Sequence, residues 1–140
     1  MTILLDYAKS FLGTPYLYGG KNRLTGIDCS GFVEEILKSG GADVPGVQNA
    51  QAFFDIFKSN PCKRQAGALS FYGTDVGHIT HVAFLLDAYR VIEAAAGDKT
   101  TLNLDEAKRR SAMVRIRPLT HRPDLQAVLW PGYPFIPKET

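Results

Sequence analysis

The chain has 140 residues, 45% of them hydrophobic and 21% charged, which is ordinary usage for one globular domain spanning residues 1–140. Sixteen basic and fourteen acidic residues are mixed along the chain and give a formal charge of +2, too little to argue for a nucleic-acid or membrane partner. The two cysteines lack metal-ligand spacing and no HExxH motif occurs, so we expect no metal and no cofactor.

The first sixty residues carry a helical pattern. Apolar residues recur at helical spacing over residues 3–12, where Thr2 is placed to cap the helix. The same spacing returns over residues 29–38, directly after Asp28, a good N-cap residue. A third helix is predicted over residues 49–57.

The rest of the chain changes to a strand-like pattern, and its four short runs are residues 68–72, 81–86, 90–94 and 114–117. Asp87 and Ala88 separate the second and third runs tightly enough for a hairpin. Asn103 is placed to cap a short helix over residues 104–110, and the proline-rich tail should pack irregularly. Helices followed by an antiparallel meander predict an α+β fold in one domain.

Cys29 stands where the second helix should begin. A thiol attacks a carbonyl well only as a thiolate, and a helix N-terminus or a neighbouring imidazole favours that form. Ser30 and Gly31 are small and leave room for a substrate beside the sulfur. The backbone N–H groups of the first turn lack acceptors within the helix and are suited to binding an oxyanion. Cys29 is therefore the candidate nucleophile.

His81 is the candidate base, because it opens the strongest strand pattern after a polar loop. A third group must hold its ring in the right tautomer, and that group should lie on the neighbouring strand. Glu93 follows twelve residues later, across the tight turn, in an otherwise apolar run. A buried carboxylate needs a partner, because burying it alone costs several kcal/mol.

Each of these residues also has a plainer interpretation. A free cysteine in a helix is often a small core residue, so Cys29 alone is weak evidence for catalysis. His81 alone could cap an element or fill the core, and Glu93 alone could be a solvated residue at a strand edge. The order of helix with cysteine, strand with histidine and strand with polar group is what favours a site.

The remaining cysteine and histidines are weaker candidates. Cys62 follows Pro61 with no histidine near it in sequence, so we expect a structural role. His78 lies in the polar loop, where no strand fixes it. His121 follows Pro118 in an arginine-rich stretch that looks like surface.

The segment Asp28–Val33 resembles the NlpC-type family of papain-like cell-wall peptidases. The likeness covers about two-thirds of the chain, and its other parts are Leu12–Gly20, Gly67–Tyr72 and His81–Leu86. It implies a papain-like α+β fold and hydrolysis of peptidoglycan stem peptides, usually between γ-linked D-glutamate and the diamino acid. It also implies that Cys29 is the nucleophile and His81 the base.

The resemblance assigns three residues to substrate. Tyr16 matches a tyrosine that lines the cleft beside the thiol. In family members that require a free N-terminal L-alanine, this tyrosine acts with the residues flanking the cysteine, here Asp28 and Ser30, to hold the amine.

The chain departs from the family pattern at three places. Glu93 stands where a histidine is usual, and Ala68 stands where an aspartate is usual. The loop over residues 20–28 is one residue longer than usual. The departures at Ala68 and Glu93 keep open an inactive wall-binding or assembly module. An amidase or acyltransferase that uses the same Cys–His pair on a small substrate also stays open, because related folds carry out both reactions.

The expected partners are stem peptides or muropeptides, with no nucleic acid and no membrane span. The N-terminus lacks the basic and apolar segments of a signal peptide, so synthesis in the cytoplasm is expected. Such a domain would suit a protein of phage lysis or of a phage tail, a secretion-system effector, or a cytoplasmic recycling peptidase, and the sequence does not choose among these.

Overall fold

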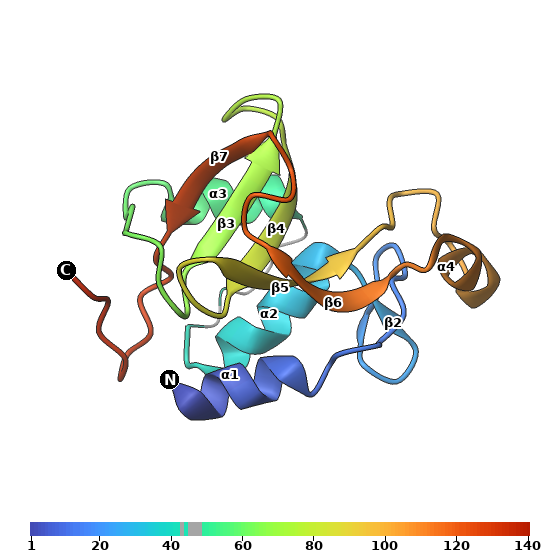
Figure 1. The fold of residues 1–140 in the computed structure, drawn as a ribbon, viewed down its shortest axis with the longest axis horizontal. Helices are drawn as coiled ribbons and strands as arrows, with labels where there is room; N and C mark the ends of the chain where they lie inside the picture. The colour runs from blue at the N-terminus through green and yellow to red at the C-terminus, as the bar shows by residue number, and fades with distance from the viewer. Residues whose placement is uncertain (43, 45–48) are drawn as a thin grey trace.

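The computed structural model describes residues 1–42, 44 and 49–140. Three helices come first: α1 over Thr2–Lys9, α2 over Cys29–Ser39 and α3 over Ala50–Phe57. A two-stranded ribbon, β1 (Lys21–Asn22) and β2 (Gly26–Ile27), lies between α1 and α2. The helices then give way to an antiparallel sheet (Figure 1), which confirms the expected α+β fold.

The main sheet has five strands in the spatial order β6-β5-β4-β3-β7. The strands are β3 (Leu69–Gly73), β4 (Ile79–Leu85), β5 (Arg90–Ala95), β6 (Met113–Pro118) and β7 (Leu125–Leu129), with helix α4 (Leu104–Arg110) between β5 and β6. All neighbouring strands are antiparallel. The predicted hairpin at Asp87 is confirmed, because Phe84 pairs with Ile92 across it.

Side-chain caps fix where the later helices begin. Asp28 accepts a hydrogen bond from the N–H of Gly31, and Asn103 accepts one from Glu106, so both predicted caps are confirmed. The prediction for Thr2 is wrong: α1 begins at that residue, after Met1, and has no side-chain cap. It also ends at Lys9 rather than residue 12, because the next residues form a turn.

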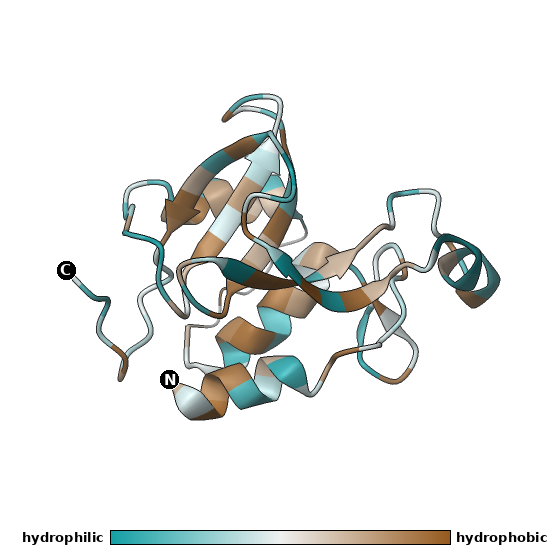
Figure 2. Ribbon diagram, viewed as in Figure 1, coloured by the Kyte–Doolittle hydropathy of each residue, from teal (hydrophilic) through white to brown (hydrophobic). Residues whose placement is uncertain are grey.

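The core lies between the helices and the sheet. α2 packs on β4 and β5, and α3 packs on β4. Phe54 of α3 meets Phe71 of β3 edge to face at 5.6 Å, and Phe11 meets Phe32 of α2 at 5.3 Å. Figure 2 shows the same division, with hydrophobic residues along α2 and the central strands and a largely hydrophilic α4.

Two strand regions were not predicted. The ribbon of β1 and β2 lies in a stretch that was expected to be a loop, and no strand was predicted at the edge strand β7. The residues of β7 are mostly half-buried, so they lack the contrast between buried and exposed positions that reveals a strand in sequence. The tail beyond β7 is irregular, as predicted, and Trp130 and Tyr133 pack edge to face at 5.2 Å. Within the described residues, no helix has the length and apolar character needed to cross a bilayer.

Candidate active site

Cys29 is the first residue of α2, and the chain around it is tightly fixed. One carboxylate oxygen of Asp28 accepts a hydrogen bond from the N–H of Gly31 at 2.7 Å, and the other accepts from Gly19 at 2.9 Å. A single side chain thus holds the helix start and the loop before it. A side chain at Gly31 would collide with the carbonyl oxygen of Gly20, so glycine is required at this close approach.

The structure brings Cys29, His81 and Glu93 together. His81 lies on β4 and Glu93 on the adjacent β5, with 3.3 Å between Nε2 of the ring and Oε1 of the carboxylate. The Cys29 thiol is the other partner of the His81 ring. Because Nε2 faces the carboxylate, Nδ1 is the ring nitrogen left for the sulfur. All three residues are buried, Glu93 almost completely at 1% exposure.

The electrostatics of this group favour a charged His81 ring beside the Glu93 carboxylate. Burial disfavours a charged His81 ring, but Cys29 and Glu93 outweigh it and raise the pKa of His81 to about 9. Burial also disfavours a charged Glu93, but the two histidines at its carboxylate, His81 and His121, hold the pKa of Glu93 below its usual value. At neutral pH the carboxylate is therefore charged, and it supports an imidazolium beside the thiol.

His121 is the residue that the sequence placed wrongly. Its side chain is 9% exposed, and its Nε2 lies 2.9 Å from the same Glu93 oxygen that His81 faces. Strands β6 and β7 lie at opposite edges of the sheet, so the connection over residues 119–124 must cross it (Figure 1). That crossing carries His121 inward, and only the strand order, which the sequence pattern did not reveal, could have predicted it.

A cleft of about 840 Å³ opens beside the thiol and contains all three residues that the resemblance assigned to substrate. Tyr16 is 6% exposed, and burial together with nearby Cys29 and Asp28 raises the pKa of Tyr16, which keeps the phenol neutral. Ser30 Oγ lies 3.2 Å from Oδ1 of Asp28. These residues line the cleft together with Cys29 and His81.

The far wall of the cleft was not predicted. The chain leaves β5 through Ala96, which has a left-handed φ of 65°, and Gly97 then lies against the ring of Tyr16 so closely that no side chain would fit there. Residues 97–100 continue along the cleft. Ala96 is a non-glycine residue in the left-handed region, so this turn is strained and its neighbours must hold it.

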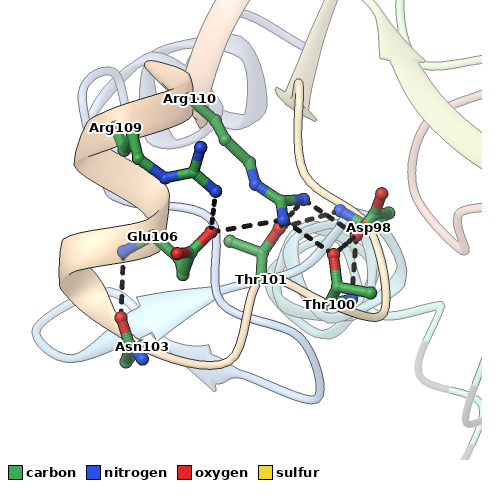
Figure 3. Close-up of polar contacts among 7 residues, drawn as sticks. All are labelled: Asp98, Thr100, Thr101, Asn103, Glu106, Arg109 and Arg110. Carbon is green, nitrogen blue, oxygen red and sulfur yellow. Dashed lines mark hydrogen bonds and ion pairs between the residues drawn. The ribbon is translucent and has the colours of Figure 1, made fainter.

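Arg110 of α4 holds that wall in place (Figure 3). Its guanidinium lies 3.0 Å from Asp98 Oδ1 and 2.8 Å from Thr100 Oγ1, and it also reaches Thr101 and Glu106. Arg110 ends the basic run over residues 108–110, and its side chain is only 26% exposed because it links α4 to the cleft wall.

The other predicted candidates lie elsewhere. His78 is exposed and pairs with Asp75 at 2.8 Å, away from the cleft lining. Cys62 is a half-buried free thiol beyond the cleft, and burial raises the pKa of Cys62. Across the described residues, no cluster of three or more histidine, cysteine, aspartate or glutamate side chains is arranged to hold a metal ion.

The two thiols should differ in reactivity. Iodoacetamide at pH 6 should alkylate Cys29 well before Cys62, because the His81 ring accepts the proton of Cys29 while burial keeps Cys62 protonated. Peptide mass spectrometry over a time course measures both rates in one sample. Equal rates at the two cysteines would contradict the pairing of Cys29 with His81, and His81→Ala should remove the difference between the two rates.

Comparison with known proteins identifies the fold and its relatives. Residues 13–117 match the NlpC/P60 family. The gamma-D-glutamyl-L-lysine dipeptidyl-peptidase of Bacillus cereus (strain ATCC 10987 / NRS 248) is 30% identical over 99 residues, which are 69% of this chain and 29% of that protein. The chain thus spans less than a third of this curated relative.

Solved structures agree with this match. The crystal structure of an NlpC/P60 family protein from Bacillus cereus ATCC 10987 has a TM-score of 0.70 and 25% identity, covering 90% of this chain and 38% of that one. RipD from Mycobacterium tuberculosis, described as a non-catalytic NlpC/p60 domain protein adapted to peptidoglycan binding, has a TM-score of 0.67 at 16% identity, covering 92% and 94%. The second likeness shows the fold alone. With most of its length matched, the chain belongs to the NlpC/P60 family.

Proposed function

We propose that this chain is a cysteine endopeptidase that cleaves peptidoglycan stem peptides between γ-linked D-glutamate and the diamino acid. The observation that carries the proposal is the Cys29 thiol, placed at the start of α2 in the cleft and paired with His81, whose ring faces the buried Glu93 carboxylate. Family membership and the activity in the name of the Bacillus cereus relative support the choice of bond.

The first half of the reaction forms an acyl-enzyme. His81 takes the thiol proton, and the Cys29 thiolate attacks the γ-carbonyl carbon of D-glutamate, so that a carbon–sulfur bond forms and the oxygen becomes an oxyanion. The backbone N–H of Cys29, in the first turn of α2, has no acceptor within the helix and is suited to stabilising that charge. The imidazolium of His81 then gives its proton to the amine of the diamino acid as the carbon–nitrogen bond breaks.

The second half restores the enzyme. A water molecule attacks the thioester carbon while His81 accepts its proton, and the carbon–sulfur bond breaks to release the γ-carboxylate of D-glutamate. The Glu93 carboxylate stabilises the imidazolium each time it forms, because the buried negative charge favours the protonated ring. Burial of this carboxylate protects the interaction from screening by solvent.

The cleft also suits the ends of a stem peptide. The Asp28 carboxylate, with Ser30 and the phenol of Tyr16, offers oxygen atoms and negative charge to the ammonium group of an N-terminal L-alanine. Lys99 and Arg122 line the same cleft, and their positive charge suits the free carboxylates that a stem peptide carries.

A synthetic tripeptide tests both the bond and the amine. The peptide L-alanyl-γ-D-glutamyl-L-lysine should yield the dipeptide and free lysine, as measured by liquid chromatography and mass spectrometry. Acetylating its N-terminal amine should slow cleavage roughly 10- to 100-fold, because hydrogen bonds to a charged group contribute about 1.5–3 kcal/mol.

Other outcomes are equally decisive. Equal rates for the free and acetylated peptides would remove the amine-binding role of Asp28, Ser30 and Tyr16. Intact peptides and intact muropeptides after long incubation would contradict the peptidase, and retained binding to insoluble peptidoglycan would then place the chain with wall-binding domains. Transfer of the acyl group to an added amine, with no hydrolysis, would indicate an acyltransferase.

A further inference from the structure

Glu93 is shared by two imidazole rings, and one of them belongs to a residue outside the Cys29–His81–Glu93 group. Oε1 of Glu93 lies 2.9 Å from Nε2 of His121 and 3.3 Å from Nε2 of His81. The shorter contact is a hydrogen bond. The longer contact, from His81, is not aligned as a hydrogen bond. Nε2 of His81 is therefore buried without a hydrogen bond to any described residue. The residue that holds the carboxylate in place here is therefore His121.

His121 is itself firmly placed. Leu119, two residues earlier in the chain, is buried. Its N–H donates to the carbonyl of Tyr89 at 2.8 Å, and its carbonyl accepts a hydrogen bond from the Tyr72 hydroxyl at 2.8 Å. The ring of Tyr72 lies 5.6 Å from the rings of both His81 and His121. The two imidazole rings thus both contact the buried Tyr72 ring, and both approach Oε1 of Glu93.

Charged groups surround this cluster on several sides. Arg122, in the same connection as His121, lies 5.4 Å from the centre of the Tyr72 ring and makes two hydrogen bonds to Asp124 at 2.9 and 2.6 Å.

A cavity of about 270 Å³ is lined by the two histidines and Glu93, with Arg117 of β6 and Arg122. Arg115 is the Cα partner of Glu93 on β6. In the lining of this cavity Glu93 is thus the acidic side chain beside two arginines, while Asp124 is held by Arg122.

We propose that His121 is a positioning residue that holds the Glu93 carboxylate where His81 uses it. Nε2 of His121 carries a hydrogen both in the imidazolium and in the Nε2–H tautomer, so the donor role does not depend on charge. Without that donor the carboxylate is free to turn toward Arg117 or Arg122, and the His81 imidazolium loses its support. The proposal deepens the proposed function, and its substrate-based readout rests on that function.

Three substitutions separate positioning from packing. His121→Ala should lower kcat on the tripeptide about 10-fold with KM unchanged within about twofold, because groups that orient a ligand or base are typically worth this much. His121→Gln should recover most of the rate, since its amide nitrogen reaches the place of Nε2. His121→Asn should recover less, because its amide nitrogen reaches only the place of Nδ1. The control His78→Ala removes an exposed histidine and should match wild type.

A second readout needs no substrate. The rate of Cys29 alkylation at pH 6 should fall in His121→Ala and return in His121→Gln, because a less supported imidazolium leaves the thiol protonated. If the tripeptide is not a substrate, this series still decides the proposal, so the two failures are distinguishable. Wild-type kcat and alkylation in a folded His121→Ala protein would overturn it. Glutamine and asparagine variants that behave alike would also overturn it, even if the alanine variant does not fold.

Discussion

Replacing Cys29 with alanine should reduce cleavage of the stem tripeptide below detection. The proposed reaction passes through a thioester on this sulfur, and no other described thiol lies in the cleft. The matched control is Cys62→Ala, which removes a half-buried cysteine outside the cleft and should leave the rate within about twofold of wild type. Chromatographic assay of released lysine measures both variants.

His81→Ala should have the next largest effect, a loss of about 10²- to 10⁴-fold in kcat. The substitution removes the group that acts both as the base for the thiol and as the acid for the leaving amine. His78→Ala again serves as the control, because that ring is exposed and pairs only with Asp75 among the described residues. A His81→Ala enzyme with more than a tenth of wild-type activity would show that another group activates Cys29. In that case the pairing with His81 is not the source of the reactivity of the Cys29 thiol.

Glu93→Ala should lower kcat by about 10- to 1,000-fold, less than loss of His81, because orienting groups contribute less than the base itself. Glu93 is 1% exposed and lies against two imidazoles, so its truncation also leaves buried polar groups without a partner. Glu93→Gln avoids that packing defect, since the amide keeps the shape and one acceptor. Thermal unfolding of each variant separates lost stability from lost catalysis.

The charge of Glu93 should also set the alkaline limit of activity. Cys29 and Glu93 raise the pKa of His81 to about 9, so the imidazolium that protonates the leaving amine persists up to that pH and is lost above it. Removing the carboxylate charge removes one cause of the raised value. In Glu93→Gln the alkaline limb of the kcat profile should therefore move to lower pH, toward the ordinary value of 6.5. An unchanged limb, with a rate within twofold of wild type, would reduce the site to a Cys–His dyad.

Local signals explain what the sequence could predict. Asp28 and Cys29 are adjacent in the chain, so a capping residue and the start of an apolar helical pattern were enough to place the thiol at a helix N-terminus. His81 and Glu93 are separated by one short hairpin, and antiparallel strands joined by a tight turn must lie side by side. The place of Cys29 at a helix start and the pairing of His81 with Glu93 therefore follow from short-range geometry, whereas the meeting of Cys29 with His81 depends on the packing of α2 against β4.

Long-range features explain what it could not. His121 reaches Glu93 only because β6 and β7 occupy opposite edges of the sheet, and no periodicity within residues 119–124 encodes that order. The role of Arg110 likewise depends on the return of residues 98–101 toward α4. Thr2 is a case where a local signal failed. It is a good capping residue, but it became the first residue of α1 and its side chain caps nothing.

The most direct test of the account is digestion of muropeptides in water enriched in oxygen-18, followed by mass spectrometry of the products. The proposed thioester on Cys29 is released by water, so the new γ-carboxylate of D-glutamate should carry one heavy oxygen, and the diamino acid should leave with a free amine. Fragmentation places the label on one residue. Unlabelled product, a label on another residue, or stems left intact by wild-type protein would contradict the assignment of this chain as a γ-D-glutamyl endopeptidase.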